Sequence, residues 1–140
     1  MLDVDTIEEV WDLLAQSRKQ FIESFYANFF DQFPDYKQYF PDCMDQQMER
    51  MMDLVSSLAR FSNHIDLIRP YLLEVGDAHK EMVLLTKQDL CNFRDVFIKT
   101  AAETCGSDWE ERHSIALHDA FDETIIPIVH EGMRGINRDS

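Results

Sequence analysis

Apolar residues recur along most of this chain at the three- and four-residue spacing of one face of an α-helix. In the first stretch, near residues 5 to 16, Asp5 and Thr6 offer a cap ahead of the apolar positions. A second stretch, residues 18 to 33, is dense with aromatic residues and is ended by Pro34. The pattern therefore predicts two helices in the first quarter of the chain.

The middle of the chain carries two more helical patterns. The first runs from about Met44 to Ser62, and the second from Ile65 to His79, with Pro70 suited to a first helical turn. The inner positions of the first pattern are Met48, Met51, Met52, Val55, Leu58 and Ala59. The second pattern ends in a histidine that its spacing places on the inner side.

Two long helices are predicted to complete the chain. Thr86 with Asp89, and Ser107 with Glu110, have the spacing of a capping box, which marks the first turn of a helix. The expected apolar positions are Leu90, Phe93, Val96, Phe97 and Ala101 in the first helix, and Ile115, Leu117, Ala120, Phe121, Ile125 and Ile128 in the second.

Glycine and proline are scarce, with 4 of each among 140 residues, and strand-like alternation of Val, Ile and Thr is rare. Gly106 is suited to end the helix that follows Thr86, and Pro127 predicts a kink just upstream of itself. A chain of this length buries one core. We therefore expect a single all-α domain over residues 1–135 and a flexible tail at 136–140.

The chain is strongly acidic, with a formal net charge of -14. Such a field repels phosphate backbones and anionic lipid headgroups, which disfavours nucleic acid and membrane partners. The apolar runs are short and the N-terminus is acidic, so we expect a cytoplasmic protein with neither a spanning helix nor a secretory signal. Cys43, Cys91 and Cys105 are odd in number and lack CxxC spacing, so reduced thiols are expected.

His79 is the histidine whose position suggests chemistry, because it ends a mostly apolar helix and precedes the apolar run at residues 82–85. The residues by themselves favour a buried histidine with a satisfied hydrogen bond over a metal ligand. The other four, His64, His113, His118 and His130, have no constellation of their own and are expected at the surface or its boundary.

A set of residues in a fixed order carries a family resemblance: Phe25-Tyr26, Phe33-Pro34, Tyr39-Phe40, Gln47 and Leu72-x-x-Val75-Gly76-x-x-His79. In this set the chain resembles the bacterial globins, particularly the haem domains of flavohaemoglobins and their single-domain, Vitreoscilla-type relatives. The resemblance implies the globin fold, a 3-over-3 helical sandwich around a pocket for haem b. It also implies that His79 binds the iron and leaves the opposite face open to a gas.

The resemblance assigns further roles around the haem. It implies that Phe40 stacks on the haem and that the Tyr26 hydroxyl donates a hydrogen bond to bound dioxygen. Gln47 fits the neighbouring distal position, although Gln46 or Arg50 would take that place if the register shifted. The other implied haem contacts are Met51, Val75, Leu85, Leu90 and Phe93, with Phe121 or Ile125 closing the pocket. From the residues alone, Phe40 could be ordinary core and Tyr26 a core tyrosine with its hydroxyl at a helix end. Apolar stripes such as Leu90 and Phe93 are more often plain core.

The implied function is reversible binding of O2, NO or CO by a monomer or homodimer. The alternatives are nitric oxide dioxygenation with an external reductase, a globin-type sensor that is haem-bound or haem-free, and a helical bundle without a cofactor. Leu90 stands where flavohaemoglobins carry a tyrosine, and their glutamate has no clear counterpart besides Glu123 and Glu131. With no reductase domain in this chain, self-sufficient dioxygenation is not expected.

Overall fold

The computed structural model describes residues 3–61, 64–78 and 86–133, and every regular element within these ranges is a helix. The elements are α1 (Val4–Gln16), α2 (Arg18–Gln32), η1 (Pro34–Tyr39), α3 (Asp45–Phe61), α4 (Ile65–Ala78), α5 (Lys87–Cys105), η2 (Gly106–Asp108), α6 (Glu111–Ala120), η3 (Phe121–Ile125) and α7 (Ile126–Met133). The prediction of an all-α chain is confirmed.

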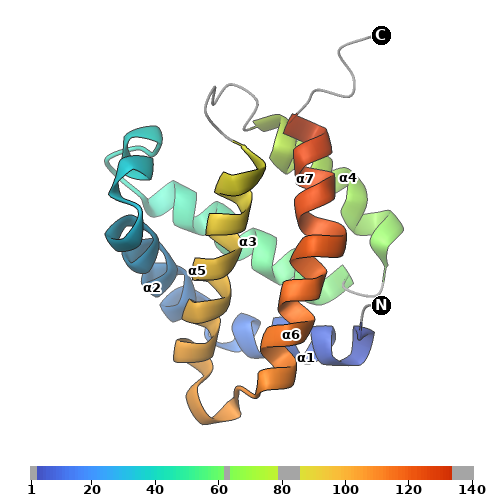
Figure 1. Ribbon diagram of the computed structural model, residues 1–140. Helices are drawn as coiled ribbons and strands as arrows, with labels where there is room; N and C mark the ends of the chain where they lie inside the picture. The colour runs from blue at the N-terminus through green and yellow to red at the C-terminus, as the bar shows by residue number, and fades with distance from the viewer. Residues whose placement is uncertain (1–2, 62–63, 79–85, 134–140) are drawn as a thin grey trace, which may run out of the picture.

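The helices pack in two crossing groups (Figure 1). α5 lies beside the nearly continuous rod of α6, η3 and α7, while α1 and α3 run behind them in this view. α2 packs on α5, α1 packs on α3 and α6, and α4 lies along α7. Helices that are far apart in the sequence therefore form the walls of one core.

Aromatic rings from α2 and α5 form the centre of this core. The ring of Phe25 lies 4.8 Å from that of Phe93, and the ring of Phe97 lies 4.8 Å from that of Phe21. Phe97 also contacts Trp11, at a centroid distance of 6.2 Å, which joins α1 to the same cluster. Each such ring removes a large apolar area from water and adds edge-to-face contacts. The dense aromatic stretch predicted for residues 18 to 33 is thus a core helix.

α4 and α7 approach each other closely through two glycines. A Cβ atom built on Gly76 would lie 2.1 Å from the carbonyl oxygen of Val129, and one on Gly132 would lie 2.3 Å from that of Leu73. These neighbours are backbone atoms that cannot move aside without shifting a helix. Glycine is therefore required at both positions, and α4 is held against α7.

Helix starts agree with the sequence at one capping box and differ at another. Thr86 and Asp89 form the predicted box at the start of α5. The box predicted for Ser107 and Glu110 is wrong, because residues 106–108 form a 3-10 turn and α6 begins after Glu110. The side chains of Glu110 and His113 make that box instead.

The first helix is also capped differently from the prediction. The carboxylate of Asp3 accepts hydrogen bonds from the backbone N–H and hydroxyl of Thr6, at 3.2 and 2.7 Å. The helix begins at Val4, so Asp5 lies inside its first turn rather than ahead of it. The cap lies earlier than predicted because Asp3 reaches the third residue of the helix, the usual geometry of an N-cap.

Two prolines lie inside helices. Pro70 is the sixth residue of α4 rather than part of its first turn, so that prediction is wrong. Upstream of Pro127, where a kink is expected, residues 121–125 form a π-helical turn. A proline cannot donate to the carbonyl four residues earlier, and a wider turn is one way to accommodate that loss.

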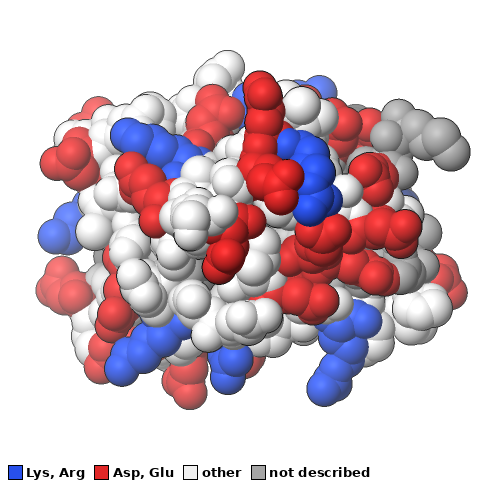
Figure 2. All heavy atoms as spheres, turned by 90° about the horizontal axis from the view of Figure 1, so that it is seen from below, with Lys and Arg blue, Asp and Glu red and all other residues white. Residues whose placement is uncertain are grey.

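The surface is mainly acidic, as the composition requires. Seen from below relative to Figure 1, Asp and Glu side chains gather on the right of the view, with Lys and Arg side chains at the border of this cluster (Figure 2). α1 and its N-cap residue together expose Asp3, Asp5, Glu9 and Asp12. Ile115, expected on an inner face, is 56% exposed on α6, which is a second error in that helix. Within the described ranges, no helix combines the length and apolarity that crossing a membrane requires.

Candidate functional site

Tyr26, which is buried, and Gln47, which is half-buried, meet between α2 and α3. The side-chain amide of Gln47 donates a hydrogen bond to the hydroxyl of Tyr26, with a nitrogen-to-oxygen distance of 3.1 Å. Gln46 and Arg50, the alternatives for this position, are both exposed. The register of α3 therefore turns Gln47 towards the tyrosine.

An aromatic wall surrounds this hydrogen bond. The ring of Phe40 meets the ring of Tyr26 edge-on, at 5.8 Å and 69°, and Phe30 meets Phe40 at 5.0 Å. Phe40 follows directly after η1, which begins at Pro34, where a fixed φ suits the first position of a helical turn. The 3-10 helix that begins at Pro34 therefore positions Phe40 against Tyr26.

The environment of Tyr26 keeps its phenol protonated. Tyr26 is only 2% exposed. Burial raises the pKa of Tyr26 to about 12, and the hydrogen bond from Gln47 opposes that rise. Within the described ranges, the hydroxyl accepts from Gln47 and its own hydrogen has no acceptor. The O–H group is thus a buried donor available to a further partner.

The other predicted haem contacts lie on three helices. Met51 is buried on α3, whereas Val75 on α4, and Leu90 and Phe93 on α5, are partly buried against the core. Phe93 and Tyr26 each contact Phe25, at centroid distances of 4.8 and 5.1 Å. One aromatic cluster therefore links the predicted distal residues to the first turns of α5.

Two predicted site residues, His79 and Leu85, lie outside the described residues. α4 is described as far as Ala78, the residue before His79. The close packing of Gly76 against α7 fixes the path of this helix up to that point. The assignment of His79 as the iron ligand remains a prediction from the sequence.

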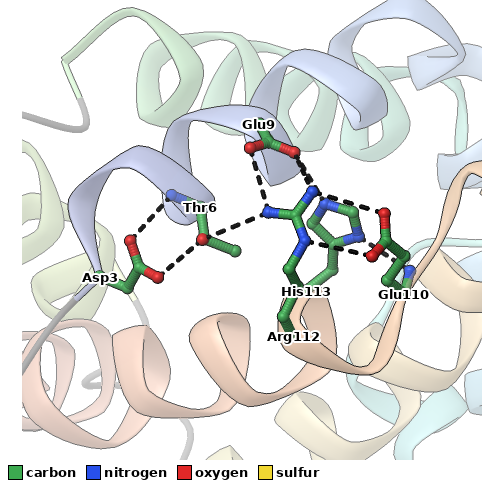
Figure 3. Close-up of polar contacts among 6 residues, drawn as sticks. All are labelled: Asp3, Thr6, Glu9, Glu110, Arg112 and His113. Carbon is green, nitrogen blue, oxygen red and sulfur yellow. Dashed lines mark hydrogen bonds and ion pairs between the residues drawn. The ribbon is translucent and has the colours of Figure 1, made fainter.

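A second polar cluster joins α1 to α6 (Figure 3). The guanidinium of Arg112 donates to both carboxylate oxygens of Glu9, at 2.8 and 3.1 Å, and also contacts Glu110. The Nε2 atom of His113 lies 3.1 Å from the same Glu9 carboxylate, and its Nδ1 atom accepts from the backbone N–H of Glu110. This cluster fastens the first helix to the penultimate one.

His113 contradicts the expectation that it lies at the surface, because it is only 1% exposed. An Nδ1 atom that accepts a hydrogen bond leaves the proton on Nε2, which then donates to Glu9. The Glu9 carboxylate and the backbone N–H of Glu110 therefore satisfy both nitrogens of the imidazole. Its position three residues after the N-cap residue Glu110 was the only local signal, and the sequence prediction instead made Ser107 the N-cap with Glu110 as its partner.

Charge pairing dominates this second cluster. The hydrogen bonds from Arg112, and then that from His113, lower the pKa of Glu9 to about 2. Among the described residues, no group of three or more His, Cys, Asp or Glu side chains could hold a metal ion. The cluster therefore offers a fastening between helices, whereas the Tyr26 region offers a buried hydrogen-bond donor beside apolar rings.

Comparison of the sequence with known proteins identifies a family. A family model described as Globin matches residues 23–128, which is more than half of the chain. The match extends from α2 into α7 and includes Tyr26, Phe40, Gln47 and His79. No curated protein matches the chain significantly. The helical architecture and this match together show that the chain belongs to the globin family and has its all-α fold.

Proposed function

We propose that this globin binds one haem b through His79 and holds a diatomic gas, O2 foremost, on the side of the pocket formed by Tyr26 and Gln47. The observation that carries the proposal is the hydrogen bond between Gln47 and Tyr26 in an aromatic surrounding. Membership of the globin family supports haem and gas binding in general.

The residues around this bond fit a haem. A haem has two broad apolar faces, which require apolar side chains with surface still available for contact. Phe40, Val75, Leu90 and Phe93 are such residues, since they pack on the core yet remain partly exposed. Phe25 and Phe97, by contrast, are fully enclosed by protein. Apolar area thus remains available where the resemblance implies that the haem lies.

The chain's own residues would determine how a gas is held. When bound, the haem supplies an iron with an open coordination position for the gas. Tyr26 contributes a protonated hydroxyl whose hydrogen has no acceptor among the described residues, and the Gln47 amide orients it. A donor of this kind favours a gas that carries partial negative charge when bound. The Tyr26 and Gln47 pair also supports our proposal that this chain is related to the haem domains of flavohaemoglobins.

Hemin titration of the purified protein tests the proposal. The wild type should take up hemin stoichiometrically, with a strong Soret band, a five-coordinate ferrous form after reduction and a stable oxygenated spectrum in air. His79→Ala should lose this uptake, whereas His118→Ala, a change at an exposed histidine, should retain it.

Two results would contradict the proposal. A wild-type protein that takes up no hemin would transfer the function to a haem-free role of the same fold. A His79→Ala variant with the normal ferric and ferrous spectra would show that another residue binds the iron.

A further inference from the structure

Tyr36 joins η1 to the first turns of α5 through its hydroxyl. That hydroxyl donates a hydrogen bond to the Asp89 carboxylate and accepts one from the Asn92 side-chain amide at 2.9 Å. Tyr36 lies more than fifty positions before both partners in the sequence, so only the fold brings it to them. Tyr36 thus has two polar partners on one helix although it belongs to another.

The ring of Tyr36 strengthens the same connection. It stacks on Phe29 at a centroid distance of 5.0 Å and an interplanar angle of 16°. Phe29 in turn contacts Phe93 of α5 at 5.9 Å. Tyr36 is therefore connected to α5 in two ways. Its hydroxyl forms hydrogen bonds with that helix, and its ring contacts Phe29, which contacts Phe93 of the helix.

Asp89 is held in place independently of Tyr36. Its second carboxylate oxygen accepts from the backbone N–H and the hydroxyl of Thr86, at 2.6 and 3.0 Å, as the cap of α5. The acceptor that receives the Tyr36 proton is therefore fixed by its own helix. Burial, and then the bond to Asp89, raise the pKa of Tyr36, which keeps the phenol in its donating form.

The two elements that Tyr36 joins carry different parts of the proposed haem pocket. Phe40 lies one turn beyond Tyr36 at the end of η1. Leu90 and Phe93 directly follow Asp89 and Asn92 in the sequence, at the start of α5. A displacement of η1 relative to α5 would therefore change the space between these apolar side chains.

We infer that Tyr36 is a positioning residue that holds the Phe40 wall against the wall of Leu90 and Phe93, and so sets how tightly the pocket retains haem. The inference rests on the proposed function, since it concerns the same pocket. It goes beyond that function by assigning haem retention to a residue that need not touch the haem.

The test compares Tyr36→Phe with Tyr39→Phe in the full chain. Tyr36→Phe keeps the ring and its stacking but removes the hydroxyl, while Tyr39 is an exposed tyrosine of the same short helix. We expect hemin to leave the ferric Tyr36→Phe protein about tenfold faster than the wild type. The free energy that a hydrogen bond to a charged group contributes is equivalent to a change of about this size in a rate constant. Tyr39→Phe should match the wild type.

Two further measurements separate positioning from a general loss of stability. The stretching frequency of bound CO, which reports on the surroundings of the gas, should shift in Tyr36→Phe only. In the haem-free protein, amide hydrogen exchange should accelerate at residues 34–40 and 86–93 in that variant and not elsewhere. Should Tyr36→Phe fail to fold, Asn92→Ala removes only one donor and should show the same changes at smaller size.

The contradicting outcomes are distinct. A wild type that binds hemin, with equal rates of hemin loss in Tyr36→Phe and Tyr39→Phe, would overturn this inference alone. Faster hemin loss with an unchanged CO frequency and exchange raised throughout the chain would also overturn it, because the role would then be general stability. A wild type that takes up no hemin would overturn the proposed function and this inference with it.

Discussion

The Tyr26 region and the cluster between α1 and α6 are built in opposite ways. Tyr26 is buried among aromatic rings and, among the residues that the structure describes, has one neutral hydrogen-bond partner, Gln47. The other cluster combines carboxylates, a guanidinium and an imidazole, and most of these groups are exposed to water. The region with fewer polar groups is the one that we propose as the ligand site, because it leaves a buried donor available.

The contrast extends to protonation. Burial raises the pKa of Tyr26, whereas hydrogen bonds from Arg112 and His113 lower the pKa of Glu9. At neutral pH the phenol of Tyr26 is a neutral donor and the carboxylate of Glu9 pairs with Arg112, and each shift moves the pKa further from neutrality. The comparison therefore predicts that changes in the two regions affect different properties: gas binding in the first and folding stability in the second.

Replacement of His113 should have the largest effect. His113→Ala removes a buried ring, leaves a cavity and deprives the Glu110 backbone N–H of its acceptor. We expect the free energy of unfolding of the haem-free protein to fall by about 2–4 kcal/mol, measured by urea denaturation. His118→Ala, at an exposed position of the same helix, should change it little. Equal effects of the two changes would show that the cluster does not fasten α1 to α6.

Replacement of Tyr26 should affect function more than folding. Tyr26→Phe keeps the ring contacts but removes the buried donor, so the dissociation rate of O2 should rise about tenfold or more, equivalent to about 1.5–3 kcal/mol. Stopped-flow displacement of O2 by CO measures this rate, and Tyr39→Phe serves as the exposed control. An unchanged rate would make Tyr26 an ordinary core residue and remove the functional side of the comparison.

Replacement of Glu9 should have the smallest effect and depend on pH. The folded pKa of Glu9 is lowered from 4.5 to about 2, so its stabilisation is complete above pH 4.5 and is lost as the pH falls towards 2. Glu9→Gln should lower the Tm slightly at neutral pH, and less at high salt because the pair is exposed. The difference from the wild type should vanish near pH 2. Glu8→Gln on the same helix is the control, and a difference independent of pH would contradict the assignment.

Features set by neighbours a few residues apart were predictable from the sequence. The helical periods, the capping box of Thr86 with Asp89, and the end of α5 at Gly106 all depend on contacts within one helical turn. The order of aromatic residues around Tyr26 and Phe40 was informative in another way, because it matched a family pattern. The structure then places these two side chains and Gln47 together.

Features that depend on distant partners were missed or misread. His113 looks like a surface histidine until Glu9, more than one hundred positions earlier, is brought to its Nε2 atom. Ile115 fits an inner helical face by spacing, yet it is exposed. Tyr36 gave no signal at all, since its partners Asp89 and Asn92 belong to another helix.

The sequence by itself determined that this chain forms amphipathic helices, where most of them begin and end, and which residues resemble a haem site. The periodicity of apolar residues and the conformations of proline and glycine are local properties, so they can be read along the chain. Only the tertiary structure decided which helix faces meet. It turned Gln47 rather than Gln46 or Arg50 towards Tyr26, and it required glycine at the α4 and α7 contact. Those outcomes depend on burial and on polar pairs formed across the core, whose energies exist only once the helices have packed.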